Sequence, residues 1–378
     1  MKIQLKIGKP AFIYILFSII FMGVHIINIS PLFANSMIAI LGLSSLLYTF
    51  KNRGIKGINS YLVFLGIIYS MLMILSTLYN GNADYTNILW VWTYMGIATL
   101  TYEFYISSKV FWGVSYIINI LLLIYIILGG NVHNVISRGS QNNISAYIIF
   151  FLAMAYLSVM KKRCSINYLP SFLVMGISAW SSSRAGILAG MFIIIATFIY
   201  NFLFIKGKKI KLLLRWIVLI IVSIWLVNNF FGQYLVDLTN KISRYGDQSV
   251  RTTIWIEYLC GMKNSIGNFL FGVKTTNSSY YWLSYYTGNT HNSFLMLHAK
   301  FGIAAIILLS ILFIKVIKKG IKERNYIVII VLFTISIRMF FDWIGFPGLY
   351  DIIFWYLVLY SFEVRFSKNK CRLEIIDE

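Results

Sequence analysis

Residues 244–302 read RYGDQSVRTTIWIEYLCGMKNSIGNFLFGVKTTNSSYYWLSYYTGNTHNSFLMLHAKFG, and they form the only long stretch of this chain that is not continuously apolar. The sequence on either side consists of apolar runs of about 18 residues or more, the length that a helix needs to cross a bilayer. The sequence therefore predicts an all-α integral membrane protein in which residues 1–378 form a single polytopic domain.

The composition excludes an ordinary soluble protein. Charged residues make up 12% and hydrophobic residues 59% of the chain, whereas soluble domains carry roughly 25% charged residues. The net charge of +21 does not indicate nucleic acid binding, because the basic residues are spread over several short loops and form no single face with interleaved aromatic residues. The three cysteines predict no disulfide framework.

We predict about twelve transmembrane helices, of which the seventh and eighth form a tight hairpin. Lys and Arg concentrate in alternate loops, which places both termini in the cytoplasm by the positive-inside rule. Residues 231–291 then form one long extracytoplasmic loop between the ninth and tenth spans. The predicted spans are 11–29, 31–50, 61–80, 86–106, 110–129, 144–160, 167–182, 185–205, 212–230, 292–314, 326–345 and 347–364.

The loop 231–291 is too long to be a mere connector. Its segment from Arg251 to Met262 has the pattern of an amphipathic helix. The run of Tyr and Trp at 280–286 has two interpretations. Aromatic residues commonly form belts at the membrane interface, and their rings also stack on sugar rings.

Two arginines outside this loop lie on the same predicted side of the membrane. Arg184 follows three serines at the hairpin turn, where it either binds an anion or extends toward lipid headgroups. Arg138 lies in SRGSQNN before the sixth span, where a helix N-terminus presents N–H donors to an anion. A solvated loop is the alternative for Arg138.

The long loop carries the other candidate residues. Arg244 and Arg251 are further candidate anion ligands, for which a solvated loop arginine is the alternative, and Glu257 either pairs with one of them or acts as a base. His291 precedes Asn292 at the start of the tenth span, and histidine is the residue type best suited to proton transfer near neutral pH. An interface histidine without a chemical role is the alternative.

Arg338 and Asp342 are four residues apart in the eleventh span and are expected to pair on one helix face. The pair serves either a structural role or the site. The sequence contains no metal-binding motif, no Walker loop and no nucleotide fingerprint. We therefore predict neither a metal nor a cofactor.

Four ordered motifs resemble the bacterial O-antigen polymerase and O-antigen ligase family. They are Arg138 to Asn143, Ser181 to Arg184, Arg251 to Trp255, and His291 to Gly302. The resemblance covers about residues 130–310. Trp255 stands where ligases often have Leu, which slightly favours a polymerase.

This resemblance implies a metal-independent glycosyltransferase in the bacterial inner membrane with its active site facing the periplasm. Undecaprenyl-diphosphate-linked oligosaccharides would be donor and acceptor, Arg184 and Arg251 would bind the diphosphate, and His291 would assist the acceptor hydroxyl. Membrane lipid and a chain-length regulator protein are the other expected partners. The alternatives are a ligase that transfers the chain to lipid A-core, and a membrane transporter or flippase.

Overall fold

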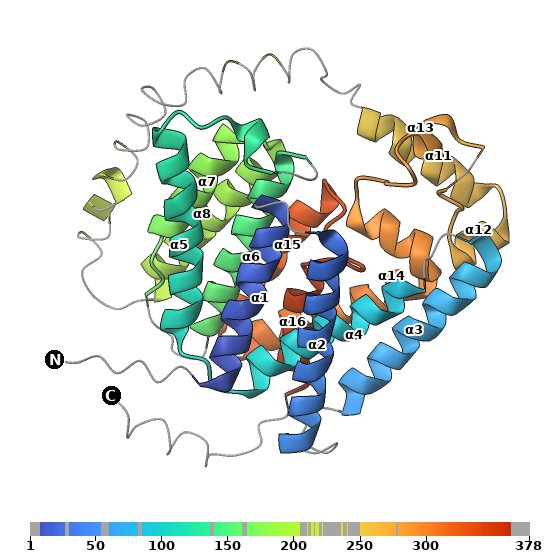
Figure 1. The fold of residues 1–378 in the computed structure, drawn as a ribbon, viewed down its shortest axis with the longest axis horizontal. Coiled ribbons are helices and arrows are strands. Elements are labelled where there is room, and N and C mark those ends of the chain that lie inside the picture. The colour runs from blue at the N-terminus through green and yellow to red at the C-terminus, as the bar shows by residue number, and fades with distance from the viewer. Residues whose placement is uncertain are drawn as a thin grey trace.

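The computed structural model describes residues 8–26, 30–53, 60–81, 85–136, 140–160, 165–204, 250–276 and 279–363, with a few isolated positions between 210 and 240. Arg138, Arg244 and most of the predicted ninth span lie outside the described residues. Throughout the described part the regular elements are helices, so the all-α prediction is confirmed. Figure 1 shows their arrangement.

The N-terminal half consists of α1 (Lys9–Ile26), α2 (Pro31–Arg53), α3 (Ser60–Asn80), α4 (Thr86–Glu103), α5 (Ser108–Ile127), the short 3-10 turn η1 (Val132–Asn134), α6 (Asn142–Ser158), α7 (Leu169–Trp180) and α8 (Arg184–Phe204). The C-terminal part consists of α11 (Val250–Lys263), α12 (Ile266–Phe271), α13 (Tyr281–Tyr285), α14 (Ser293–Lys322), α15 (Tyr326–Phe340) and α16 (Asp351–Phe362).

Five of these helices, α2, α3, α5, α8 and α14, are long and apolar enough to cross a membrane. Their outer faces expose large apolar side chains, such as Leu32 (80% exposed), Leu78 (71%) and Ile195 (53%). Soluble monomers rarely expose extended apolar surfaces, so this surface supports a membrane-embedded protein. The predicted number of twelve spans remains a prediction.

Two helices, α6 and α16, form the centre of the bundle. Every residue from Ile144 to Leu157 in α6 is buried, as is every residue from Asp351 to Ser361 in α16. A helix that is surrounded by others must present an apolar surface on all sides. The Tyr350 hydroxyl donates to the Ala146 carbonyl (2.9 Å) and ties the start of α16 to α6.

The predicted hairpin is confirmed, because α7 and α8 are joined by a turn at residues 181–183 and pack against each other. The helix that was predicted at Arg251–Met262 is present as α11, and it is buried at Ile254, Tyr258 and Gly261. Trp255 of α11 packs edge-on against Phe340 (ring centroids 5.4 Å), which holds α11 at the end of α15.

A kink interrupts α14 at Gly302, whose φ is +76°. A Cβ at Gly302 would lie only 2.2 Å from the Leu270 carbonyl oxygen of α12. From α3, the Asn80 side chain donates to the Ala299 carbonyl (3.2 Å) and the Ser76 hydroxyl does the same (3.2 Å). The Ala299 carbonyl at the kink therefore accepts hydrogen bonds from two side chains of α3, a helix more than 200 residues earlier in the chain.

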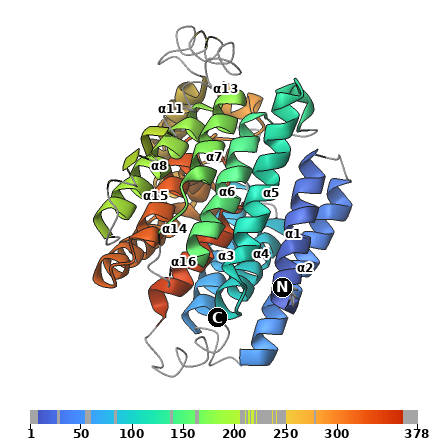
Figure 2. The same cartoon turned by 90° about the vertical axis from the view of Figure 1, so that its left-hand side faces the viewer.

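The two ends of the bundle carry different groups of residues. At one end, the Arg53 guanidinium of α2 donates to the Glu103 carbonyl of α4 (2.8 Å). Glu363, after α16, accepts there from Tyr102 (2.6 Å), and its carbonyl accepts from Lys319 (2.6 Å). The starts of α6, α8 and α14 and the ends of α7 and α15 lie at the opposite end, as do α11 and α13 (Figure 2).

Candidate functional site

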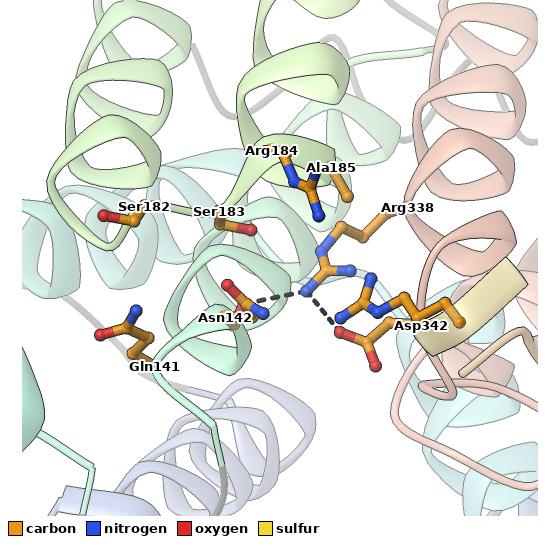
Figure 3. A pocket seen from close by; sticks show the side chains of 9 residues that line it. Gln141, Asn142, Ser182, Ser183, Arg184, Ala185, Arg338 and Asp342 are labelled. Atoms are coloured by element: carbon orange, nitrogen blue, oxygen red, sulfur yellow. Dashed lines mark hydrogen bonds and ion pairs between the residues drawn. The ribbon is translucent and has the colours of Figure 1, made fainter. Parts of the chain in front are cut away.

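A polar cavity of about 140 Å³ lies at the end of the bundle that carries α11. It is large enough for several water-sized groups. Arginines from three separate helices line it together with hydroxyl and amide groups (Figure 3). The lining residues are Gln141, Asn142, Ser182, Ser183, Arg184, Ala185, Arg251, Arg338 and Asp342.

Three helix N-termini meet at this cavity. Asn142 is the first residue of α6, Arg184 is the first of α8, and Arg251 is the second of α11. Helix N-termini carry partial positive charge and free N–H groups, so they favour anions. The backbone and the arginine side chains therefore contribute charge of the same sign.

The turn before α8 places Arg184 at the rim of the cavity. Ser182 has a φ of +50°, a conformation that is costly for a residue with a side chain. The Ser183 hydroxyl accepts from the Gly186 amide (3.2 Å) and bonds the Ser145 hydroxyl of α6 (2.8 Å). These contacts fix the first turn of α8 against α6, while the Arg184 side chain remains exposed.

Arg338, near the end of α15, is fully buried (0% exposed). Its Nη2 donates to the Asn142 carbonyl (2.9 Å) and to Asp342 Oδ2 (3.1 Å). Its Nε and Nη1 have no hydrogen-bond partner among the described residues. Leaving such donors unpaired in the interior is costly, and both belong to a side chain that lines the cavity.

Arg251 enters from α11, and its Nη1 donates to the Phe341 carbonyl (2.6 Å). Burial lowers the pKa of Arg251, the carboxylate of Asp342 opposes this effect, and repulsion from Arg338 and Arg184 adds to it. The three guanidinium groups are thus close enough to repel one another. An anion between them would relieve that repulsion.

Asp342 is the one acidic side chain among the described residues that line the cavity. Its burial raises its pKa, but the His291 ring and the charges of Arg338 and Arg251 outweigh burial and hold the pKa at about 2. Asp342 is therefore ionised at neutral pH. Three arginines face one aspartate, which leaves the cavity with an excess of positive charge.

His291 lies beside the cavity and reaches it through Asp342. Its Nδ1 is 3.8 Å from Asp342 Oδ1, an ion-pair distance that is too long for a hydrogen bond. Its φ of +50° is held by a bond from its amide to Asn289 Oδ1 (2.8 Å), and its ring packs edge-on against Tyr286.

The first residues of α14 hold the segment that carries Asp342. Asn292 caps the helix by accepting from the amides of Phe294 (2.9 Å) and Leu295 (3.1 Å). The Ser293 hydroxyl donates to the Asp342 carbonyl (2.7 Å) and accepts from the Ile344 amide (3.1 Å). Asn292 therefore has a structural role, and Ser293 ties the start of α14 to the segment that carries Asp342.

The structure thus brings together Arg184, Arg251, Arg338 and Asp342, and places His291 next to them. Arg338 and Asp342 pair as predicted. That both side chains line the cavity was not predicted. The clue in the sequence was a charged pair at the end of an apolar span, a costly position that often marks function. Gln141 and Asn142 belong to the motif Arg138 to Asn143, but neither was named on its own as a site residue.

Glu257 does not pair with Arg251 in the structure, and the alternative pair with Arg244 lies outside the described residues. Its carboxylate accepts from the backbone amides of Trp282 (3.3 Å) and Leu283 (3.0 Å) at the start of α13. Arg251 instead bonds the Phe341 carbonyl. The expected pair with Arg251 is replaced by a bond that positions α13, because the turn of α11 that carries Glu257 faces α13 rather than the cavity.

Within the described residues, no cluster of three or more His, Cys, Asp or Glu side chains is arranged to hold a metal ion. Comparisons of the chain with models of known protein families, with curated protein sequences and with solved structures yield no match.

Proposed function

We propose that this protein is a membrane polymerase of O-antigen or a related surface polysaccharide. It transfers an undecaprenyl-diphosphate-linked glycan onto the next lipid-linked repeat unit, at the outer face of the bacterial inner membrane. The observation that carries the proposal is the meeting of Arg184, Arg251 and Arg338 around one cavity with a single carboxylate, in a chain with helices of membrane-spanning length.

A diphosphate diester suits this cavity by charge. It carries about two negative charges, which match the excess of the three arginines over Asp342. Guanidinium groups bind phosphate oxygens in a bidentate manner and stay protonated when buried. Fixed in a site with little water, they stabilise charge that develops on a leaving group. In this proposal they supply the positive charge, and no metal is required.

His291 has the role of general base in the proposed reaction. It accepts the proton of the acceptor sugar hydroxyl, whose oxygen attacks the anomeric carbon of the donor. The bond between that carbon and the diphosphate oxygen breaks, and undecaprenyl diphosphate leaves with the electron pair. Since His291 Nδ1 faces Asp342 (3.8 Å), Nε2 is the nitrogen that receives the proton.

The proposed sidedness follows from the two ends of the bundle. Basic residues such as Arg53 and Lys319 lie at the end opposite to the cavity, and basic residues mark the cytoplasmic side of membrane proteins. The cavity would then open at the periplasmic face, where a lipid-linked donor presents its diphosphate at the interface. Exposed Arg184 would meet that headgroup first.

The test is an assay with purified protein in detergent, lipid-linked repeat units and a chelator, with products resolved on a gel. We expect a ladder of lipid-linked oligomers. The variant R251A should lose the ladder, whereas the matched control R53A, an arginine at the opposite end of the bundle, should keep it.

Two other outcomes would change the assignment. Transfer only after the addition of lipid A-core would make the protein a ligase. Neither product from folded protein with its native repeat unit would contradict the enzyme proposal and favour transport.

A further inference from the structure

Four aromatic side chains from α13 and the residue after it form a continuous series of ring contacts, which we call the aromatic ladder. It consists of Tyr281, Trp282, Tyr285 and Tyr286. The Tyr281 and Tyr285 rings are stacked (centroids 6.1 Å, interplanar angle 26°), and the Tyr285 ring meets Tyr286 edge-on (5.2 Å). Tyr281 and Tyr285 are 66% and 65% exposed.

The aromatic ladder is held in a fixed position. The Glu257 carboxylate accepts two backbone amides at the start of α13, and Leu283 is buried against Ile254 and Tyr258 of α11. A helix of five residues does not persist without such support. The support comes from α11, which lies beside α13 at the cavity end of the bundle (Figures 1 and 2).

The aromatic ladder leads to the site. The Tyr286 ring meets the His291 ring edge-on (5.4 Å), and His291 in turn faces Asp342, which lines the cavity. A row of rings therefore begins at exposed Tyr281 and Tyr285 on the surface of α13 and continues through half-buried Tyr286 to the proposed base.

We propose that the aromatic ladder is a carbohydrate-binding surface that holds the glycan of the acceptor while its hydroxyl reaches His291. A pyranose ring has an apolar face of C–H groups and a rim of hydroxyls. Tyr and Trp match it with a flat apolar ring and a polar edge. The assignment of this glycan to the acceptor rests on the proposed function.

A role as a membrane-interface belt fits the geometry less well. Belt residues flank spanning helices, where they anchor those helices to the interface. The aromatic ladder instead belongs to a short helix whose packing partner is α11. An anchor also has no need of ring contacts that continue to a histidine beside a charged cavity.

The test is binding of the free repeat-unit oligosaccharide, released from its lipid diphosphate, to the full-length protein in detergent by saturation-transfer NMR. We expect Y281A/Y285A to raise the Kd roughly tenfold, which corresponds to about 1.4 kcal/mol, because both exposed rings are lost. Y281F/Y285F should bind as the wild type does, because it keeps the rings. Y85A is the matched control: Tyr85 is 58% exposed at the start of α4, at the same end of the bundle.

The outcomes separate this inference from the proposed function. If Y281A/Y285A binds the sugar weakly while Y281F/Y285F and Y85A bind it as the wild type does, the sugar-binding surface is supported. This holds even if the protein forms no polymer. In an active protein the same variant should raise the KM for the acceptor and leave kcat little changed. Equal binding by Y281A/Y285A and wild type, or no binding by the wild type, overturns the inference.

Discussion

Asp342 contacts both the buried arginine of the site and the proposed base. One carboxylate oxygen accepts from buried Arg338 (3.1 Å), and the other faces His291 (3.8 Å). Arg338 has further N–H groups without a partner among the described residues, and Asp342 is the acidic side chain with which its guanidinium pairs there. A group in this position contributes to the stability of the protein as well as to the orientation of His291.

We expect D342N to lower the free energy of unfolding by about 3–5 kcal/mol at pH 7, because it leaves a buried charge unpaired. The pKa of Asp342 is depressed to about 2, below the ordinary value near 3.9. Its stabilising contribution is therefore complete above about pH 4 and is lost as the pH falls through about 2. Denaturation in detergent at several pH values measures this effect.

The pH series contains its own control. The difference in stability between the wild type and D342N should shrink by about 2.5 kcal/mol between about pH 4 and pH 2, as the wild-type carboxyl becomes neutral, because each unit of pKa shift corresponds to about 1.4 kcal/mol. A difference that stays constant over this range would show that the substitution acts through packing, and the charge role of Asp342 would be wrong.

At the same scale, sequence reasoning identified Arg184, Arg251 and His291 by residue type and predicted sidedness. It did not predict that Asp342 would join His291 to the cavity. That contact requires residues 341–345 to fold back onto the Ser293 hydroxyl, which bonds the Asp342 carbonyl and the Ile344 amide. Such a contact joins residues about 50 positions apart, and a local sequence pattern does not predict it.

The element that departs most from its sequence pattern is α14. Its apolar run predicted one span from 292 to 314, and the structure has a helix from Ser293 to Lys322 with a kink at Gly302. The segment lacks the proline that commonly kinks a helix. The kink arises because α12 packs closely against Gly302, and Asn80 and Ser76 of α3 satisfy the freed carbonyl. The helix pattern was therefore predictable, whereas the kink depended on partners distant in sequence.

We expect G302A to destabilise the protein strongly. The added Cβ would lie 2.2 Å from the Leu270 carbonyl oxygen, and the φ of +76° disfavours any side chain. The matched control is G113A in the middle of α5, where a Cβ meets no heavy atom within 4 Å. There alanine should be neutral or stabilise the helix by up to about 1 kcal/mol. Thermal unfolding of both variants in detergent makes the comparison.

Because α12 and α14 meet at Gly302, G302A should also displace the segment that begins at His291. Loss of polymer formation at a temperature where the variant is still folded would be consistent with this coupling. If G302A and G113A unfolded at the same temperature, the close approach of α12 to α14 would be contradicted.

At the scale of the whole molecule, the proposed function requires that the two ends of the bundle face opposite sides of the membrane. Length and composition were enough to predict the all-helical class, and alternating basic loops predicted which helix ends share a side. The arrangement of Arg53 and Lys319 at one end and the cavity at the other agrees with that pattern. Packing of α6 and α16 at the centre was not predictable, because every span is apolar and their sequences do not distinguish central from peripheral positions.

This arrangement predicts which cysteines a membrane-impermeant thiol reagent reaches in spheroplasts. In a C164S/C371S background, Cys260 is exposed on α11 and should be labelled in intact cells, because α11 lies at the cavity end. In the same background with C260S, the variant N52C should be labelled only after the membrane is permeabilised. Asn52 is exposed near the end of α2, beside Arg53. Labelling of N52C but not of Cys260 in intact spheroplasts would place the cavity in the cytoplasm. A donor at the outer face would then be unable to reach the three arginines, and the proposed polymerase reaction would fail together with the topology.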